Sequence, residues 1–199
     1  MEALNNRTGA IERKTNETDI QLSIDLDGVG RRNIRQPVPF FGHMLDLFAK
    51  HSGFDLTIDA TGDIEIDDHH TVEDIGICLG EAFRIAISDK SGIRRYGSRY
   101  VPMDESLAHV ALDISGRPFL VFHATFGTEK IGTFHTELVE EFFRAFSSHA
   151  QVTLHINLAY GTNAHHMVEA IFKAFAGALS EAVRRDGTVR GVLSTKGML

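Results

Sequence analysis

A short cluster of histidine and acidic residues occurs twice in this chain, 96 residues apart, and this repeat narrows the range of possible folds. One copy, Asp68–Asp74, reads Asp-His-His-Thr-Val-Glu-Asp, and the other, Ala164–Ala170, reads Ala-His-His-Met-Val-Glu-Ala. Each copy precedes an amphipathic apolar stretch that predicts a helix, over 75–87 and 171–183. A motif repeated together with its following helix indicates an internal duplication.

The repeat extends upstream, where residues 42–51 align with residues 140–149 and place His43 over Glu141. Each of these segments is followed by an apolar stretch that predicts a strand, over 54–59 and 152–159. The helix that begins with the two histidines comes next in both halves. We therefore expect an α+β fold made of an internally duplicated two-layer unit, in which each half is a mostly antiparallel sheet packed with helices.

Apolar periodicity and turn residues predict the elements in more detail. The predicted elements are a strand at 20–26, a loop at 29–38, a helix at 40–50, strands at 54–59 and 64–66, a helix at 69–88, a strand pair at 106–114 and 118–126 around a turn at 115–117, a helix at 135–149, a strand at 152–159 and a helix at 165–184. We expect one domain over residues 1–199, with pseudo-repeats at about 13–95 and 96–190 and a short C-terminal tail.

Composition excludes several classes of protein. A length of 199 residues with 43% hydrophobic content suits one domain with a substantial core. The net charge of -7 and the scattered Lys and Arg residues argue against broad nucleic-acid binding. Residues 1–10 lack the apolar core of a signal peptide, and no stretch approaches the roughly 20 apolar residues of a membrane helix, so a cytoplasmic protein is expected. Cys78, the single cysteine, is expected to be a buried core residue.

The spacing within each cluster indicates metal binding. On a helix, the first His and the Glu are four residues apart and the second His and the Glu are three apart, so the three side chains share one face. Imidazole nitrogens beside a carboxylate suit Mn, Fe, Zn or Ni, whereas Ca and Mg favour oxygen ligands. One copy alone is more often a solvated helix start, but two copies at matching places favour metal binding in both halves.

The chain resembles the imidazoleglycerol-phosphate dehydratases, enzymes of histidine biosynthesis, from about Arg13 to Leu199. The matching segments are Arg13–Thr18 (Arg-Lys-Thr-Asn-Glu-Thr), Phe40–Leu45 (Phe-Phe-Gly-His-Met-Leu), Asp67–Asp74, Ser115–Pro118 (Ser-Gly-Arg-Pro), His165–Ala170 and Ser194–Gly197 (Ser-Thr-Lys-Gly). The resemblance implies a fold like domain 2 of ribosomal protein S5, with a substrate-binding C-terminal tail, in a homo-oligomer of 24 subunits built from trimers.

The resemblance also implies a hydro-lyase that converts D-erythro-imidazole glycerol phosphate to imidazole acetol phosphate and water. Two Mn²⁺ ions per active site, or other divalent transition metals, are implied. One cation on each ring nitrogen would stabilise an imidazolate, whose electrons expel the hydroxyl through a diazafulvene-like intermediate. A base then removes the adjacent proton, and the resulting enol becomes the ketone.

Seven metal ligands follow from the resemblance, although the pairing of ligands on each metal stays open. They are His43, His69, His70, Glu73, His165, His166 and Glu169. Some relatives carry His where this chain has Glu141, so Glu141 is an eighth candidate, with His135 and His149 as alternatives. Gly42 stands where the family usually has Asp, which removes a partner for His43. The duplication suggests two pseudo-equivalent sites, completed across a subunit boundary.

The resemblance also supplies candidates for acid/base catalysis and phosphate binding. Glu17 matches a family Glu that contacts the reacting glycerol chain, while Glu73 and Glu169 are alternative bases. The predicted substrate and phosphate ligands are Arg95, Arg117, Ser194, Thr195 and Lys196, with Asp104 and Glu105 lining the pocket. Without the resemblance, an exposed Glu, a turn Arg and a frayed tail would be the ordinary interpretations.

Two other classes of function fit the metal-binding pattern. A non-catalytic metal-binding protein would use the same histidines, but it leaves the predicted phosphate ligands unexplained. A metal-dependent phosphate-ester hydrolase would use its metals to activate water. The two hypotheses differ from the dehydratase in their product, because a dehydratase forms a ketone and a hydrolase releases phosphate.

Overall fold

The computed structural model describes residues 7–199, so Met1–Asn6, part of the segment expected to lack a signal peptide, lie outside the described residues. None of the helices within residues 7–199 combines the length and the hydropathy that a membrane-spanning helix needs. The elements of the first half are β1 (Thr8–Lys14), β2 (Thr18–Asp25), β3 (Arg32–Arg35), α1 (Pro39–Ser52), β4 (Asp55–Gly62) and α2 (His69–Ile87). Those of the second half are β5 (Tyr96–Met103), β6 (Ser106–Asp113), β7 (Phe119–His123), β8 (Lys130–Ile131), β9 (Phe134–His135), α3 (Leu138–Ala150), β10 (Thr153–Tyr160) and α4 (Ala164–Val183).

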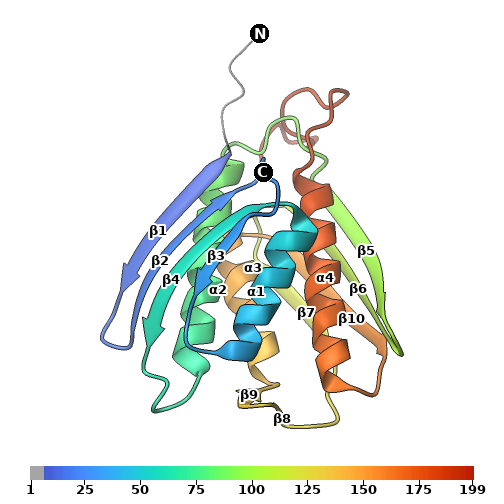
Figure 1. Cartoon of the computed structure of the whole chain (residues 1–199). Helices are drawn as coiled ribbons and strands as arrows, with labels where there is room; N and C mark the ends of the chain where they lie inside the picture. Colours follow the sequence, from blue (N-terminus) through green and yellow to red (C-terminus); the bar gives the residue numbers. More distant parts are fainter. Residues whose placement is uncertain (1–6) are drawn as a thin grey trace.

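The two halves have the same sheet topology. The first sheet has the order β1-β2-β4-β3 and the second has the order β5-β6-β10-β7. In each sheet the last pairing, β3 with β4 or β7 with β10, is parallel and the other pairings are antiparallel. Figure 1 shows the four helices between the two sheets, with α2 against the first and α4 against the second.

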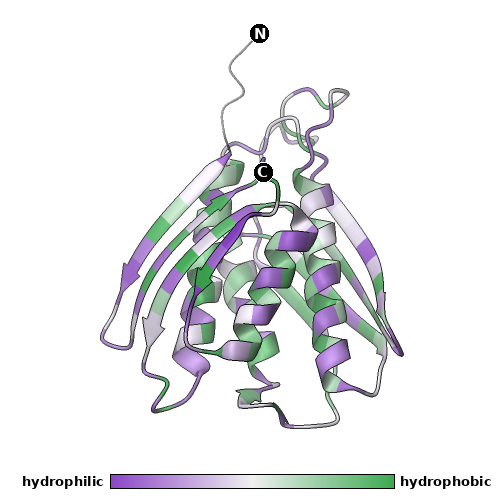
Figure 2. Cartoon of the chain, viewed as in Figure 1, coloured by the Kyte–Doolittle hydropathy of each residue, from purple (hydrophilic) through white to green (hydrophobic). Residues whose placement is uncertain are grey.

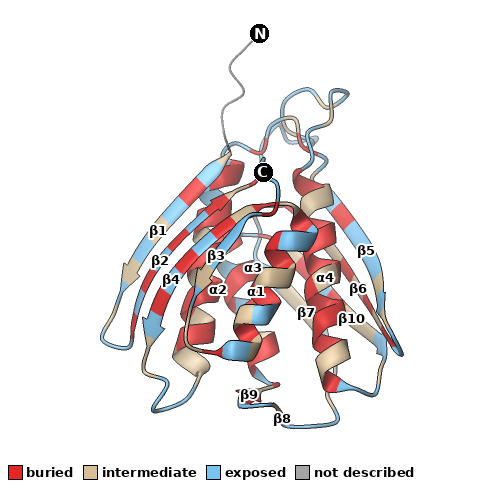
Figure 3. Ribbon diagram, viewed as in Figure 1, coloured by how far each residue is buried: buried red, intermediate tan, exposed pale blue. Residues whose placement is uncertain are grey.

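The inner faces of the sheets follow the alternating apolar pattern of the strands. Ile20, Leu22 and Ile24 of β2 are buried, while the residues between them are exposed. Most buried positions of the strands and helices are apolar, as a comparison of Figures 2 and 3 shows. The expected alternation of strands and helices in each half is therefore present, with one core between the two sheets.

Two glycines show that the duplication extends to backbone packing. A Cβ atom on Gly9 of β1 would lie 1.9 Å from the carbonyl oxygen of Ala82 on α2. A Cβ atom on Gly97 of β5 would lie 1.9 Å from the carbonyl oxygen of Ala178 on α4. Only glycine permits this approach of strand to helix, and both halves require it at the corresponding place.

Aromatic side chains fill the core between the helices. Phe143 packs against Phe172 and Phe175, with ring centroids 5.0 and 5.1 Å apart, and all three are buried. Cys78 is also buried, as expected, and burial raises the pKa of its thiol to about 12. The thiol therefore stays protonated at neutral pH.

Several local predictions were wrong. The predicted loop at 29–38 contains β3, and the predicted strand at 64–66 is a turn in which Ile64 and Ile66 are exposed. The helix expected at 135–149 begins at Leu138, because residues 134–135 pair with β8 instead. The predicted strand pair at 106–114 and 118–126 does not form, because β10 lies between β6 and β7 and bonds to both.

Candidate metal centre and phosphate cavity

One compact set of metal donors lies where α1 meets the start of α4. His43 of α1 and His165 of α4 each place Nε2 next to the same oxygen, Oε1 of Glu169, at 2.9 and 3.0 Å. Donor atoms of these three residues all lie within 4.8 Å of one another. The Asn163 side chain begins α4 by accepting the backbone N–H of His165. Two imidazoles and a carboxylate at this spacing fit a divalent transition metal.

Glu169 is a buried carboxylate held in its ionised form. Lys173, one turn further along α4, lies with Nζ 2.6 Å from Oε2 of Glu169. Burial opposes ionisation, but hydrogen bonds from Lys173, His43 and His165 outweigh it and lower the pKa of Glu169 to about 2. The carboxylate is therefore negatively charged at neutral pH. Lys173 was not among the predicted site residues, although its position four residues after Glu169 on the same helix face is a signal that could have identified it.

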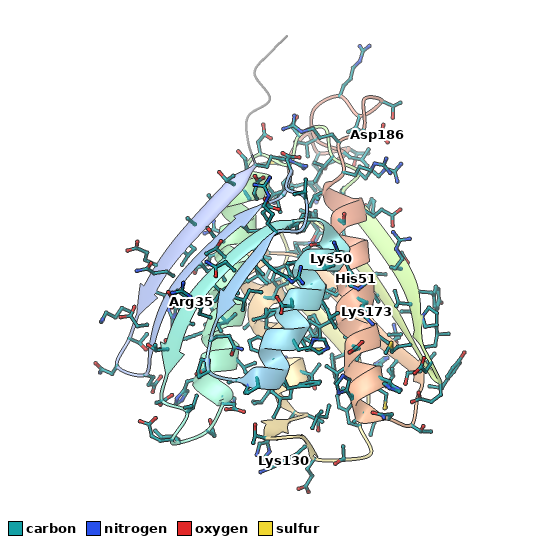
Figure 4. All side chains as sticks on the ribbon, viewed as in Figure 1. Arg35, Lys50, His51, Lys130, Lys173 and Asp186 are labelled. Atoms are coloured by element: carbon teal, nitrogen blue, oxygen red, sulfur yellow. The ribbon has the colours of Figure 1, made fainter. Side chains whose placement is uncertain are left out.

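The same cation affects a histidine of the neighbouring helix. Figure 4 shows Lys173 of α4 beside His51 of α1. Burial is the largest cause that lowers the pKa of His51, and the positive charge of Lys173 adds to it. His51 therefore favours the neutral form more than a histidine free in water does.

The second histidine of this half faces two other acidic residues. Nδ1 of His166 lies 2.8 Å from Oε2 of Glu105, and Nε2 lies 3.8 Å from Oδ2 of Asp104. The pKa of His166 is raised, chiefly by its hydrogen bond to Glu105. The pKa of Glu105 is lowered, most of all by the backbone N–H of Asn163 and then by His166.

In the first half, His70 likewise faces two acidic residues, and the glutamate of this cluster is more exposed. Nδ1 of His70 lies 3.0 Å from Oδ2 of Asp63, and Nε2 lies 3.8 Å from Oε1 of Glu17. The pKa of His70 is raised, mainly by the hydrogen bond with Asp63. His69 Nε2 and Glu73 Oε2 are 3.9 Å apart, and the Glu73 side chain is 43% exposed against 8% for Glu169.

The two donor clusters also differ in sequence one turn after the glutamate. Ile77 stands 96 residues before Lys173, so Glu73 has no cation one turn along its helix. Within residues 7–199, no three donors of the first half lie as close together as His43, His165 and Glu169. The metal donors His69, His70 and Glu73 at the start of α2 are therefore further apart than those of the compact set.

The structure does not bring Glu141 into a compact donor set. Its Oε1 lies 3.9 Å from Nε of Arg144 on the same helix. The two alternatives are also engaged elsewhere, since His135 lies 4.0 Å from Glu137 and Nδ1–H of His149 donates to the carbonyl of Ala145.

Another side chain, that of Gln36, lies next to Gly42. A Cβ atom there would lie 2.4 Å from Nε2 of Gln36, whose amide is bonded to both backbone groups of Val38. Gln36 occupies the space that a larger residue at position 42 would need.

The predicted phosphate ligands gather at a different end of the molecule. A cavity of ≈ 1180 Å³ is lined by Arg95, Arg117, Ser194, Thr195 and Lys196, among others. The tail is tied to this cavity, because Arg95 donates to the carbonyl of Leu193 at 2.6 Å. Nε of Arg95 lies 2.7 Å from Oδ1 of Asp113, and the Arg95 side chain is only 11% exposed. The Arg117 side chain is 68% exposed.

The cavity and the histidine clusters are far apart within one chain. The histidines lie at the first turns of α2 and α4, and the tail begins after the last turn of α4, at the opposite end (Figure 1). With a rise of about 1.5 Å per residue, the 20 residues of α4 span about 30 Å. Asp104, predicted to line the pocket with the phosphate ligands, lies beside His166 instead.

The fold and its two histidine–carboxylate clusters define a class of duplicated α+β enzymes. A family model described as imidazoleglycerol-phosphate dehydratase matches residues 36–179. An imidazoleglycerol-phosphate dehydratase of Acetivibrio thermocellus is 60% identical over 189 residues, covering 95% of this chain and 97% of the relative. One from Bacillus licheniformis is 62% identical over 187 residues, covering 94% and 96%.

Solved structures agree with these relatives. The crystal structure of imidazoleglycerol-phosphate dehydratase from Staphylococcus aureus has a TM-score of 0.83 and 48% identity, covering 90% of this chain and 99% of that one. The Pyrococcus furiosus enzyme, solved in complex with (S)-C348, has a TM-score of 0.83 and 37% identity, covering 95% and 100%. The chain belongs to the imidazoleglycerol-phosphate dehydratase family. The predicted duplicated α+β fold and the predicted dehydratase of histidine biosynthesis, a hydro-lyase, are confirmed.

Proposed function

We propose that this chain converts D-erythro-imidazole glycerol phosphate to imidazole acetol phosphate at a site that holds two divalent ions, either Mn²⁺ or another divalent transition metal. The observation that carries this proposal is the compact set formed by His43, His165 and Glu169. The counterparts of His165 and Glu169 are His69 and Glu73, which lie at the start of α2. The proposed ligands are His43, His69, His70, Glu73, His165, His166 and Glu169. Glu141 is left out, because it lies against Arg144.

The protein groups around the metals have separate tasks. When bound, the two cations supply positive charge that stabilises the negative charge developing on the imidazole ring. Glu169 contributes a negative charge to the compact set with His43 and His165, because the hydrogen bond that Lys173 donates to its other oxygen favours the ionised form. A ligand held this way is poorly suited to carry a proton during turnover.

Glu17 is the proposed acid/base residue. It lies in the turn between β1 and β2, where the hydroxyl of Thr15 accepts its backbone N–H at 3.0 Å. Its side chain is 53% exposed and reaches within 3.8 Å of His70 Nε2, so it is free to meet a substrate beside the metal ligands. Glu17 would take the proton from the carbon next to the departing hydroxyl. Glu73 is the alternative base, since it is similarly exposed.

The phosphate group requires cationic and hydroxyl donors. Arg95, Arg117, Ser194, Thr195 and Lys196 line one cavity and offer a planar guanidinium fork, hydroxyls and an ammonium. About 30 Å of α4 separates this cavity from the histidine clusters, which is longer than a three-carbon phosphate substrate. One chain therefore would not provide both ends of a single site.

We infer that the active site forms where one copy presents its metal ligands to the phosphate cavity of a second copy. Such sites fit a closed homo-oligomer. We propose an assembly of 24 subunits built from trimers, acting in the cytoplasm, with residues 1–199 forming one catalytic domain in each subunit. This arrangement accounts for the distance along α4 without any large movement of the chain.

Metal removal tests the proposed chemistry. Protein treated with a chelator is expected to lose dehydratase activity and to recover it on addition of Mn²⁺. The measurement is ketone formation from imidazole glycerol phosphate, with inorganic phosphate followed in parallel. Full activity after verified metal removal would contradict the metal centre, and release of phosphate in place of ketone would indicate a hydrolase.

Subunit mixing tests the shared site. Glu169→Gln removes the metal end and Arg117→Ala with Lys196→Ala removes the phosphate end, so each variant alone is expected to be inactive. Co-expressed in equal amounts, the two are expected to recover about a quarter of wild-type activity, because one site in four receives both intact ends. Each variant expressed alone is the control. An inactive mixture, with mixed oligomers demonstrated by affinity tags, would place both ends of the site in one chain.

A further inference from the structure

The turn between β5 and β6 holds a carboxylate, Glu105, to which the proposed chemistry gives no task. Its Oε2 lies 2.8 Å from Nδ1 of His166. Its Oε1 accepts the backbone N–H groups of Asn163 at 2.8 Å and Thr162 at 3.1 Å, together with the hydroxyl of Ser106 at 2.9 Å. These hydrogen bonds to Oε1 fix the carboxylate independently of the contact that Oε2 makes with His166.

This contact determines which ring nitrogen of His166 carries the proton. An ionised carboxylate can only accept hydrogen bonds, so Nδ1 of His166 must be the donor. In the neutral ring, the lone pair is then on Nε2, the nitrogen that lies 3.8 Å from Oδ2 of Asp104. A metal ligand needs that free lone pair, and its ring must be held still.

In the first half, Nδ1 of His70 is also paired with a carboxylate, but this carboxylate comes from a different segment of the chain. The counterpart of Glu105 is Glu17, because each directly precedes the first residue of the second strand, Ser106 or Thr18. Glu17 does not contact Nδ1 of His70, and Asp63, just after β4, takes that position at 3.0 Å. Each half thus pairs Nδ1 of its second histidine with a carboxylate, although the carboxylates are not equivalent in the duplication.

We propose that Glu105 and Asp63 are positioning residues that hold the proton on Nδ1 of His166 and His70 and so present Nε2 to the metals. The inference rests on the proposed metal centre. It also gives a reason for the difference between the two turns. Because Asp63 orients His70, Glu17 is left free to act on substrate, whereas Glu105 is committed to His166.

Glu105 and Asp63 differ in the other hydrogen bonds that their side chains make. Glu105 also binds Thr162 and Asn163 at the start of α4, so its removal would disturb the helix as well as the ring. The Asp63 side chain accepts no backbone N–H within residues 7–199, and its Oδ1 is buried without a hydrogen-bond partner there. Asp63→Ala therefore separates ring orientation from helix anchoring.

The experiment measures Mn²⁺ binding by the metal-free protein through the EPR signal of free Mn²⁺, with thermal unfolding recorded for each variant. Asp63→Ala and Glu105→Ala are each expected to weaken one class of Mn²⁺ site by about 10- to 100-fold. Glu105→Gln keeps an acceptor oxygen for Nδ1–H and is expected to lose less than Glu105→Ala. Glu65→Ala, an exposed carboxylate two residues from Asp63, is the control and should bind Mn²⁺ like the wild type.

Each outcome has a distinct meaning. Wild-type Mn²⁺ affinity in both alanine variants would overturn the positioning role while leaving the metal centre intact. Weakened binding in Asp63→Ala that is matched by a loss of thermal stability would make the residue structural and would also overturn the role. If the wild-type protein itself binds no Mn²⁺, the proposed metal centre fails, and this inference fails with it.

Discussion

Glu169→Gln is expected to lower kcat by about 10³-fold while the chain keeps its fold. The substitution removes the negative charge that His43 and His165 share at the start of α4. Glutamine still offers an oxygen to Lys173, so the free energy of unfolding should fall by only about 1.5 to 3 kcal/mol. The measurements are ketone formation, Mn²⁺ content per subunit and circular dichroism.

Glu140→Gln is the matched control for this substitution. Glu140 also pairs with a cation four residues later, Arg144, but its side chain on α3 is 40% exposed against 8% for Glu169. Its variant should keep wild-type activity and Mn²⁺ content. Wild-type turnover in Glu169→Gln would rule out Glu169 as an essential ligand.

Glu17→Gln is expected to lower kcat by about 10²- to 10⁴-fold without loss of bound Mn²⁺. The amide cannot accept or deliver the proton, yet it keeps the size of the side chain in the turn between β1 and β2. Because Glu17 lies outside the compact donor set, metal content should match that of the wild type. Steady-state kinetics and metal analysis on the same preparation provide the measurement.

A second variant on the same hairpin serves as the control for Glu17. Glu12→Gln changes an exposed carboxylate of β1 and should leave kcat unchanged. If Glu17→Gln remains fully active while Glu73→Gln loses turnover and keeps its metal, the acid/base role belongs to Glu73.

The parts of the site that depend on local geometry could be predicted from the sequence. The spacing of His165 and Glu169 predicted that their side chains would meet on one helix face, and their atoms are 3.0 Å apart. The long helices α2 and α4 were also predictable, because each has an apolar periodicity over many residues. The duplication strengthened both predictions.

Elements and partners that depend on distant contacts could not be predicted. Gly9 is the only residue of β1 that is buried, so the strand lacks the alternating large apolar residues that mark β2. The four-residue strand β3 is held by its parallel pairing with β4, which the sequence does not reveal. In the site, Asp63 reaches His70 only because the turn after β4 folds back over the start of α2.

The length of α4 carries a consequence for how the enzyme behaves on dilution. If each site joins two copies, specific activity depends on protein concentration, and it declines once the assembly dissociates, even while every chain stays folded. A compound that reaches from the tail cavity to the histidines would then bind only the associated protein and would slow the exchange of subunits. Such a compound would hold the assembly together while it blocks the reaction.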